Sequence, residues 1–511
     1  MPTSRTYHES TSYDRKNMDR TVLDWQNQPM PYKIYPEMTP LHLPEIKDFY
    51  SGALSHVMAG ACTSSCQNSL IMEDLAKILY LANGLTGKSR QGASDFYFRS
   101  APSAGALYPN EIYLVWSGSS ELPSGVFHCG VFNRSLTPLR DGNFVPVFQT
   151  GQDAIKSNPV AVFVVSGMFF RSAWKYRRRA YRYVLLDAGH VMENLRLAIR
   201  AAGKTCRVSY AFDDPDVNNL LGLDPEREVA IGFIQVYGNT SQTDRPDHPQ
   251  EIPVVEPLPE SIRRSGRASD TEIRYQEILD IHLAGKHIVT PDTTPEDVLT
   301  RLGLSYAPFK SIDFPDEALP DTDPNSPLPY AKTVLIRRSR RNYISHPIRV
   351  NQVMFMLNLI SNVWQNLSGV AHGVASRLAT GLLIGNVDGI APGFYLLDAE
   401  KRFLNRVFEG DVIPKMAHVC LDQHWLANAG VHFLFLTNLD MIDRQWGARG
   451  YRYAMTLAGH MGHAVYLGAT ALGLGACGIG ALYDSEARNL LGLNTESALV
   501  YLVAAGPVKR N

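Results

Sequence analysis

The residue types best suited to chemistry form a cluster of arginines that begins at Arg337. The run reads Arg-Arg-Ser-Arg-Arg-Asn-Tyr, so several guanidinium groups and one hydroxyl fall within five residues. Arginine offers planar, paired hydrogen-bond donors, which suit a phosphate dianion better than the single ammonium of lysine. A solvated basic patch or a processing site is the plainer interpretation of the same run. The cluster is a candidate phosphate site, and its context must decide between these interpretations.

Two loops rich in small residues could lie against a flat ligand. Residues 99–111 contain Ser-Ala-Pro-Ser-Ala-Gly-Ala-Leu-Tyr-Pro and lead into an expected strand at residues 112–116. The prolines, serines and glycine predict a rigid turn, although such a loop can also merely connect two elements. Residues 474–480 read Leu-Gly-Ala-Cys-Gly-Ile-Gly, and glycines let a backbone approach a ring closely. Both loops are therefore candidate ligand contacts.

The sequence segments that position these loops occur twice in the chain. Arg-x-Tyr-Arg-Tyr, Ala-Gly-His and Leu-Leu-Gly-Leu begin at residues 179, 188 and 220, and begin again at 449, 458 and 490. The differences 449−179, 458−188 and 490−220 are each 270, so the two passages align without a gap. Two long copies are too few for a solenoid. We expect a fused pseudo-dimer of two similar domains.

Hydrophobic periodicity predicts how each copy is built. A stripe with steps of three and four across residues 181–202 predicts a central buried helix, and residues 160–165 and 500–505 have the length of strands. The expected fold class is α+β, with a mixed sheet wrapped by helices in each copy. The expected organisation is an extended arm (1–45), a first domain (46–240), a Pro/Asp-rich linker (241–330) with short helices, and a second domain (331–511).

Composition excludes several classes of function. The chain has 511 residues, 45% of them hydrophobic, so it can bury a large core. Its formal charge of -1 provides no overall field for nucleic acid or an anionic membrane. No apolar run reaches the roughly 18 residues that span a bilayer, and the six scattered cysteines form neither a disulfide framework nor a zinc pattern. We expect a soluble, cytoplasmic protein without a metal site.

The loop at residues 100–109 resembles the flavin-contacting segment of the nitroreductase superfamily, in its SagB-type branch of azoline oxidases. Arg-Arg-Ser-x-Arg at the start of a domain also looks like that superfamily's signature for the phosphate and ribityl chain of FMN. The resemblance implies two fused FMN-dependent nitroreductase-like domains. It implies that FMN is bound by Arg337, Arg338, Ser339 and Arg341, by Pro102, Ser103, Ala104 and Gly105, and by Gly475, Ala476, Cys477, Gly478, Ile479 and Gly480.

Each copy lacks what the other keeps. At the offset of 270, the three glycines of residues 475–480 correspond to Thr205, Val208 and Tyr210, so the first copy has bulk in their place. Residues 51–68 contain no Arg or Lys, and the second copy has no Pro-Ser-Ala-Gly loop. Members of this superfamily usually place each flavin between two subunits. The resemblance therefore implies one complete site, and one FMN per chain.

Lys175 and Tyr176 are the candidate catalytic pair. They begin a Lys-Tyr-x-x-Arg-x-Tyr-Arg run like that of SagB-type dehydrogenases, and the second copy has Gln445 and Trp446 at these positions. Dehydrogenation of an azoline needs a base for a carbon-bound proton while hydride leaves to the flavin. A lysine of lowered pKa or a tyrosinate could be that base. A charged face beside a buried helix is the plainer alternative.

The resemblance implies an FMN-dependent oxidoreductase that converts a thiazoline or oxazoline to the thiazole or oxazole, with O2 reoxidising the flavin. The substrate would be a peptide or a carrier-bound intermediate, and a cyclodehydratase or synthetase of the same pathway is a candidate partner. Two other functions stay open: an NAD(P)H-dependent reductase of nitro, quinone or enone groups, and a degenerate flavin-binding scaffold. His190 and His460 are expected to form hydrogen bonds in the core, and Cys62 and Cys66 are assigned no metal.

Overall fold

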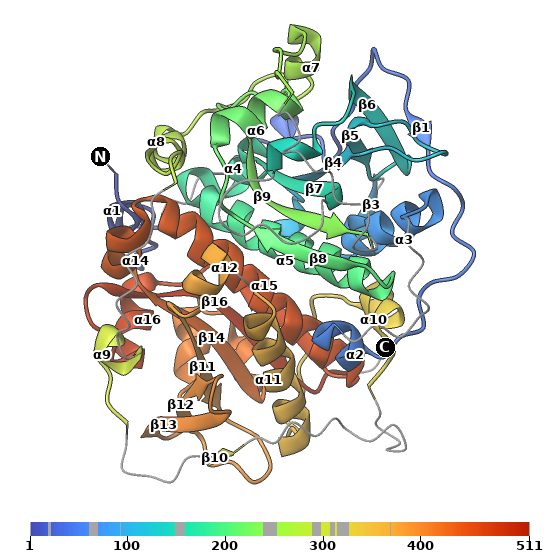
Figure 1. Cartoon of the computed structure of the whole chain (residues 1–511). Helices are drawn as coiled ribbons and strands as arrows, with labels where there is room; N and C mark the ends of the chain where they lie inside the picture. Colours follow the sequence, from blue (N-terminus) through green and yellow to red (C-terminus); the bar gives the residue numbers. More distant parts are fainter. Residues whose placement is uncertain are drawn as a thin grey trace.

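The computed structural model of the chain describes residues 2–18, 22–60, 70–91, 94–148, 159–238, 253–288, 298–306, 312–313, 327–367 and 369–509. Cys62 and Cys66 lie outside the described residues. So does the end of the segment 51–68, which contains no Arg or Lys. Figure 1 shows two halves that meet along a pair of long helices, with the first half in blue to green and the second in orange to red.

The described strands form two seven-stranded sheets of the same design. The first has the order β1-β6-β5-β4-β7-β9-β8 and the second β10-β13-β12-β11-β14-β16-β15. The strands of the first are β1 (Leu41–His42), β4 (Asn110–Trp116), β5 (Gly125–Gly130), β6 (Ser135–Asp141), β7 (Pro159–Met168), β8 (Thr205–Ser209) and β9 (Glu228–Tyr237). Those of the second are β10 (Ile312–Asp313), β11 (Leu378–Ile384), β12 (Gly393–Asp398), β13 (Phe403–Glu409), β14 (Val431–Asn438), β15 (Gly475–Ile479) and β16 (Ser497–Gly506).

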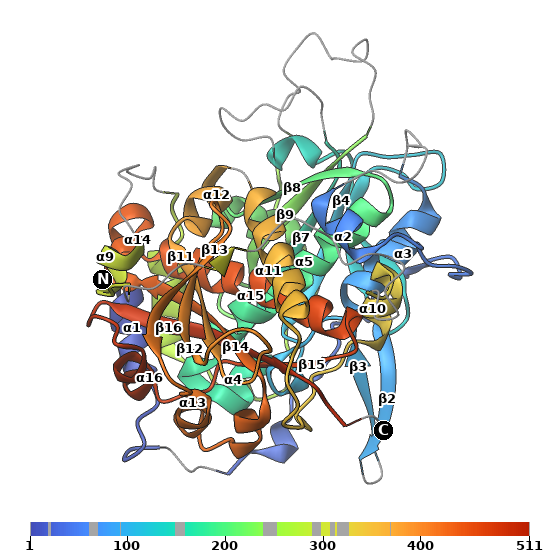
Figure 2. The ribbon, with the colours of Figure 1, turned by 90° about the horizontal axis from the view of Figure 1, so that it is seen from below.

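All ladders within these two sheets are antiparallel. The expectation of a mixed sheet is therefore wrong for these strands, although one isolated parallel bridge, between Ser339 and Ala476, adjoins β15. The reason is local: short turns connect β4, β5 and β6, and such turns join antiparallel neighbours. A separate hairpin of β2 (Leu85–Gln91) and β3 (Ser94–Arg99) projects from the first half, as Figure 2 shows.

The helices also repeat. The first half holds α2 (Leu54–Ala59), α3 (Met72–Asn83), α4 (Phe169–Tyr176), α5 (Ala180–Ala201) and α6 (Asp214–Leu221). The second holds α10 (Tyr330–Ile336), α11 (Val350–Gln365), α12 (Gly369–Ala375), α13 (Ile413–Val419), α14 (Leu439–Trp446), α15 (Arg449–Ala471) and α16 (Asp484–Leu491). The arm contributes α1 (Ser4–Ser10), and the segment between the domains contributes α7 (Glu260–Arg264), α8 (Gln276–Ala284) and α9 (Val298–Leu302).

The central helices α5 and α15 cross at two glycines related by the offset of 270. A Cβ on Gly189 would lie 2.0 Å from the carbonyl oxygen of Thr456, and a Cβ on Gly459 would lie 2.2 Å from that of Leu186. Real Cβ atoms do not approach so closely, so only glycine permits this crossing. The predicted central helix is confirmed, and its Ala-Gly-His motif marks the point where the two domains touch.

The arm and the segment between the domains make corresponding contacts. Helix α1 carries His8 and helix α8 carries His282, and each histidine faces a buried aspartate that two arginines also contact. Strands β1 and β10 likewise each pair with the outer strand of a sheet, β6 and β13. Helix α1 packs on α14 of the second half, whereas α8 lies against the residues that follow α4 in the first half. The two arms therefore cross over.

Among the described residues, no helix is both long and apolar enough to cross a bilayer. The same part of the chain contains no group of three or more His, Cys, Asp or Glu side chains that could hold a metal ion.

Candidate functional site

The Pro-Ser loop of residues 100–109 is held in a left-handed turn by one buried acid. Gly105, Ala106 and Tyr108 all have positive φ angles, of 64°, 53° and 48°. The hydroxyl of Ser103 donates to Asp187 Oδ2 at 2.6 Å, and the backbone N–H of Ala104 donates to Oδ1 at 3.1 Å. The Ser103 oxygen also accepts from the N–H of Tyr108 at 2.8 Å. Strained backbone that is held this firmly is typical of functional loops.

Lys175 and Tyr176 lie directly against this loop. A Cβ on Gly105 would be 2.8 Å from the Tyr176 hydroxyl and 3.3 Å from Lys175 Nζ, so the missing side chain keeps both polar groups accessible. The pair ends helix α4, and Arg177 after it has a positive φ of 50°. Lys175 and Gly105 are exposed, while Tyr176 is half-buried.

The pKa values of the two side chains move in opposite directions. Lys175 is exposed in part only, and its partial desolvation, followed by the positive charge of Arg341, lowers its pKa. Burial, and next the carboxylate of Asp187, raises the pKa of Tyr176. Tyr176 therefore keeps its proton at neutral pH, which argues against the tyrosinate, and Lys175 is the group that is pushed towards its neutral, basic form.

The arginine cluster of the second half reaches the same loop. Arg337 donates from Nε to the carbonyl of Ser100 at 2.7 Å and from Nη2 to that of Arg99 at 3.0 Å. Its Nη1 is buried and has no partner among the described residues. Arg338 instead holds the hairpin, because its Nη2 donates to the carbonyl of Thr86 at 2.6 Å. The side chains of Ser339 and Arg341 are exposed.

The glycine loop forms β15 and lies behind the arginine cluster. Ser339 forms a parallel bridge with Ala476, and its hydroxyl contacts the Tyr466 hydroxyl at 3.0 Å. Tyr466 also accepts from the N–H of Gly478 at 2.6 Å. A Cβ on Gly478 would overlap the hydroxyl of Tyr501 at 1.9 Å, so this glycine leaves room for a tyrosine.

The end of β15 connects back to the Lys-Tyr pair. A Cβ on Gly480 would lie 2.7 Å from the ring of Tyr183 on α5. The rings of Tyr183 and Tyr176 in turn have centroids 4.2 Å apart. The Pro-Ser loop, the Lys-Tyr pair, the arginine cluster and the glycine loop therefore surround one place between the two halves, although they come from four separate stretches of sequence.

A one-directional chain of hydrogen bonds stands behind Tyr501. Asn194 donates from Nδ2 to the carbonyl of Ala82, so its Oδ1 must accept from His463 Nε2, 2.7 Å away. Burial lowers the pKa of both His190 and His463, and in His463 it outweighs the opposing effect of Glu193, so both rings are neutral. His463 Nδ1 then accepts from His190 Nδ1, and His190 Nε2 accepts from the Tyr501 hydroxyl at 2.9 Å. The prediction that His190 forms hydrogen bonds in the core is confirmed.

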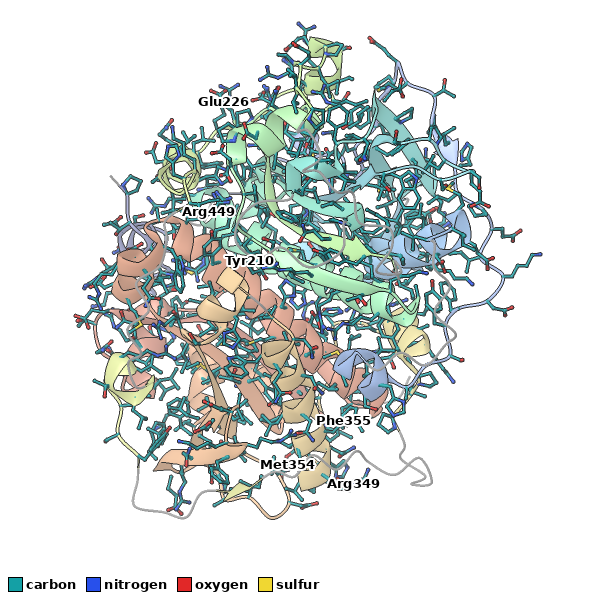
Figure 3. All side chains as sticks on the ribbon, in the orientation of Figure 1. Tyr210, Glu226, Arg349, Met354, Phe355 and Arg449 are labelled. Atoms are coloured by element: carbon teal, nitrogen blue, oxygen red, sulfur yellow. The ribbon has the colours of Figure 1, made fainter. Side chains whose placement is uncertain are left out.

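At the equivalent place on the opposite side of the interface, the described side chains have different chemistry. The offset of 270 replaces Tyr466 by Arg196 and Tyr501 by Ile231. Arg196 forms a buried ion pair of 2.6 Å with Glu193, and His460 contacts the same glutamate at 3.1 Å. Tyr210, labelled in Figure 3, is buried against Tyr453 and His460. The counterpart of Arg337, residue 67, lies outside the described residues.

Sequence reasoning missed several residues of this site: Asp187, Tyr183, Tyr466 and Tyr501. The offset of 270 could have pointed to Tyr466 and Tyr501, because their first-half counterparts have different chemistry. Of the other two residues, Asp187 differs from its counterpart, Leu457, whereas Tyr183 has the same residue type as its counterpart, Tyr453. Nothing in the sequence indicated that Asp187 would meet the Pro-Ser loop.

Two duplicated α+β halves, with the four segments brought together between them, define a fused pair of similar domains. The chain belongs to the nitroreductase family, whose pattern matches residues 67–238 and again residues 337–507. The structure is similar over 99% of both chains to a nitroreductase-type protein of Anabaena variabilis, with a TM-score of 0.76 and 24% identity, which shows the shared fold.

Three relatives extend this comparison. A nitroreductase-type protein of Methanocaldococcus jannaschii, MJ1384, is 30% identical over 158 residues, which are 30% of this chain and 80% of that one. The trifolitoxin-processing protein TfxB of Rhizobium leguminosarum is 26% identical over 41% of this chain and 57% of its own length. The microcin B17-processing protein McbC of Escherichia coli is 27% identical over 28% of this chain and 55% of its own length. The chain thus spans little more than half the length of the two processing proteins.

Proposed function

We propose that this chain is an FMN-dependent oxidoreductase with one FMN, which dehydrogenates a thiazoline or oxazoline in a peptide or carrier-bound intermediate. The observation that carries the proposal is the meeting of Lys175 and Tyr176 with Gly105 of the Pro-Ser loop, beside Arg341 of the second half. The candidate proton acceptor comes from the first copy and the candidate phosphate site from the second. Both lie at the same point between the two halves.

The residues present fit the phosphate of FMN. Arg337 Nη1 is a buried donor without a partner among the described residues, and Ser339 and Arg341 expose a hydroxyl and a guanidinium beside it. Cys477 and the glycines of residues 475–480 offer a flat backbone surface behind them. Bound there, FMN would supply the hydride acceptor. The roles of Pro102, Ala104, Ala476 and Ile479 as contacts to the cofactor belong to the same proposal.

The chain's own side chains divide the proton chemistry. Lys175 Nζ, whose pKa is lowered, takes up the proton from the carbon of the azoline ring while the hydride leaves from the adjacent atom. Tyr176 keeps its proton and can donate a hydrogen bond to the substrate heteroatom. Asp187 fixes the loop against which both groups lie, so that the substrate is held in a single orientation.

The names of two relatives support the substrate class. TfxB and McbC are processing proteins of trifolitoxin and microcin B17, so a peptide or carrier-bound substrate and a synthetase or cyclodehydratase partner are part of this proposal. Cys129, Cys206, Cys420 and Cys477 are free thiols, which is consistent with a cytoplasmic location.

The test is anaerobic mixing of the flavin-loaded protein with a thiazoline-containing peptide, monitored by loss of flavin absorbance. We expect one flavin per chain, and a rate that rises with pH as Lys175 becomes neutral. Lys175→Met should slow the reaction about 10²–10⁴-fold, remove this pH dependence and keep the flavin, since loss of a general base has that magnitude. Lys415→Met, at an exposed lysine of α13, is the matched control and should behave as the wild type.

Three outcomes would contradict the proposal. A flavin-to-protein ratio near two would show that the second site also binds. Product formation unchanged in both Lys175→Met and Tyr176→Phe would favour a scaffold. Rapid bleaching by NAD(P)H, without bleaching by the thiazoline peptide, would favour a nitro, quinone or enone reductase.

A further inference from the structure

A cavity of about 280 Å³, lined by charged as well as apolar side chains, lies under the N-terminal arm, outside the site described above. The arm covers it with residues 32–40, and the turn between β5 and β6 forms its other wall. Lys33, Arg99, Glu111 and His128 line it, together with Tyr32 and Thr137. Lys33, Arg99, Glu111 and His128 are all less than a tenth exposed, which is uncommon for charged residues unless they are paired.

The charges around this cavity do not balance. Lys33 Nζ forms an ion pair with Glu228 at 2.6 Å, and Arg171 pairs with Glu111, whose other oxygen contacts His128 at 3.1 Å. Each of the two carboxylates thus has its own cation. Arg99, 1% exposed, is a third cation, and none of the ion pairs within the described residues of this cluster includes it.

The guanidinium of Arg99 also has an unused donor. Its Nη2 donates to the carbonyl of Pro31 at 2.5 Å, whereas its Nη1 is buried and has no partner among the described residues. The rings of Tyr32 and Tyr108 lie 5.5 and 4.8 Å from its central carbon and attract it. Glu111 also attracts it, but forms its ion pair with Arg171. A buried cation with a free donor costs several kcal/mol unless an anion accompanies it, on the order of the desolvation penalty of one ion.

We propose that this cavity binds a carboxylate, which pairs with Arg99 and completes the charge balance of the cluster. One unpaired positive charge matches one negative charge, whereas a phosphate dianion would bring an excess. The cavity is much larger than a monatomic anion and is partly walled by tyrosine rings, so the carboxylate belongs to an organic molecule. The inference goes beyond the proposed function, because it needs neither a flavin nor a redox step.

Arg99 also connects this cavity to the other site through its backbone. Its carbonyl accepts a hydrogen bond from Arg337, and its N–H donates to the Tyr108 hydroxyl at 3.1 Å, so its backbone anchors the Pro-Ser loop. The carboxylate has two possible sources: a free organic acid, or a carboxyl group of the substrate itself. Both would use the same donor.

The test for binding follows the thermal unfolding of the full-length protein in acetate, propionate or benzoate, with chloride and phosphate at equal ionic strength. We expect the unfolding midpoint to rise with the logarithm of carboxylate concentration, and to do so for neither inorganic anion. Arg99→Gln should lose this response, and Lys88→Gln, an exposed lysine on the neighbouring hairpin, should keep it. Equal effects of all anions, or of none, would overturn the proposal.

Should Arg99→Gln fail to fold, a crystal of the wild-type protein grown with 4-bromobenzoate, which does not alkylate side chains, decides the question. Bromine density in the cavity with a carboxylate oxygen within hydrogen-bond distance of Arg99 Nη1 supports the proposal, and water alone there overturns it. The source is then distinguished by comparing peptides with a free acid and with an amide. A KM that rises for the amide in the wild type, but not in Arg99→Gln, identifies the substrate's own carboxyl group, and equal KM values identify a free acid.

Discussion

Asp187 is the residue on which the geometry of the site depends most directly. It is 5% exposed, and burial raises its pKa to about 7, even though the hydrogen bonds from Ser103 and Ala104 act in the opposite direction. A carboxylate with this pKa is costly to bury, and its compensation is a fixed loop. The same carboxylate is an electrostatic neighbour of Tyr176, so the acid that shapes the loop also keeps Tyr176 protonated.

A double-mutant cycle tests this link. Ser103→Ala should lower the free energy of unfolding more when residue 187 is Asp than when it is Asn, with a coupling of about 1.5–3 kcal/mol, the range for a hydrogen bond to a charged group. Chemical denaturation of the four proteins measures it.

The control for that cycle combines Asp187→Asn with Ser4→Ala, because Ser4 donates to a different acid, Asp443. Those two changes should add within about 0.5 kcal/mol, as expected for sites without shared partners. Additivity in the Ser103 cycle as well would show that the loop does not depend on Asp187.

At the scale of elements, the crossing of α5 and α15 decides whether the two halves can share a site. The two helices approach so closely that the backbone oxygens of Leu186 and Thr456 occupy the space of a side chain. His190 and His463, one on each helix, contact at 3.2 Å and continue the chain to Tyr501. If the helices moved apart, these hydrogen bonds would break and Tyr501, which packs against the glycine loop, would lose its support.

Gly459→Ala should destabilise the protein by about 1–3 kcal/mol or more, the range for overpacking, and should lower flavin content. Gly373→Ala on α12 is the control. Its Cβ would lie 3.6 Å from the Trp446 ring, an ordinary van der Waals contact, and alanine favours a helix by about 1 kcal/mol. Thermal unfolding and flavin absorbance report both effects. Equal destabilisation by the two substitutions would contradict a special role for the crossing.

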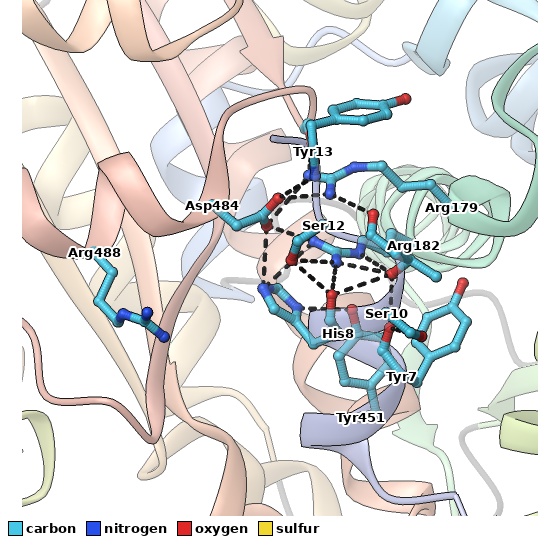
Figure 4. A network of polar contacts seen from close by, with 12 residues as sticks. Tyr7, His8, Ser10, Ser12, Tyr13, Arg179, Arg182, Tyr451, Asp484 and Arg488 are labelled. Carbon is cyan, nitrogen blue, oxygen red and sulfur yellow. Dashed lines mark hydrogen bonds and ion pairs between the residues drawn. The ribbon is translucent and has the colours of Figure 1, made fainter. Parts of the chain in front are cut away.

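At the scale of the molecule, two matching clusters fasten the halves together. In one, Asp484 of α16 pairs with Arg179 and Arg182 of the first half at 2.7 Å each, and His8 of the arm contacts it at 3.1 Å (Figure 4). In the other, Asp214 of the first half pairs with Arg449 and Arg452 of the second at 2.9 and 2.7 Å, and His282 contacts it at 3.4 Å. Each half thus supplies the acid for the other half's arginines.

These clusters predict a stability that falls in acid. Burial, and next Arg182, lowers the pKa of His8 to about 4, from an ordinary value of 6.5. The unfolded chain therefore binds a proton below pH 6.5 that the folded protein does not bind until about pH 4, so His8 destabilises the fold as the pH falls through this window. At pH 5 a single histidine with this shift lowers the free energy of unfolding by about 2 kcal/mol.

His8→Gln should remove that part of the loss in unfolding free energy between pH 7 and pH 5, while His346→Gln, at an exposed histidine, should leave the slope unchanged. Denaturation at the two pH values measures it. Asp484 acts at lower pH: burial raises its pKa, but Arg179 and Arg182 outweigh this and hold it well below 3.8, so its contribution disappears only below about pH 4. A slope unaffected by His8→Gln would show that other groups control the acid response.

The sequence by itself determined the duplication, the long central helix and the segments with the chemistry, because periodicity and short motifs are local properties of a chain. Residues 337–341, 100–109 and 474–480 could each be recognised without knowing where the others lie. Tertiary structure alone decided that Asp187 holds the loop, that Tyr501 stands behind Gly478 and that the segment between the domains makes contacts corresponding to those of the arm. These facts depend on contacts between residues tens to hundreds of positions apart, such as Arg337 with Ser100, and the burial and charge of such contacts exist only once the halves have met.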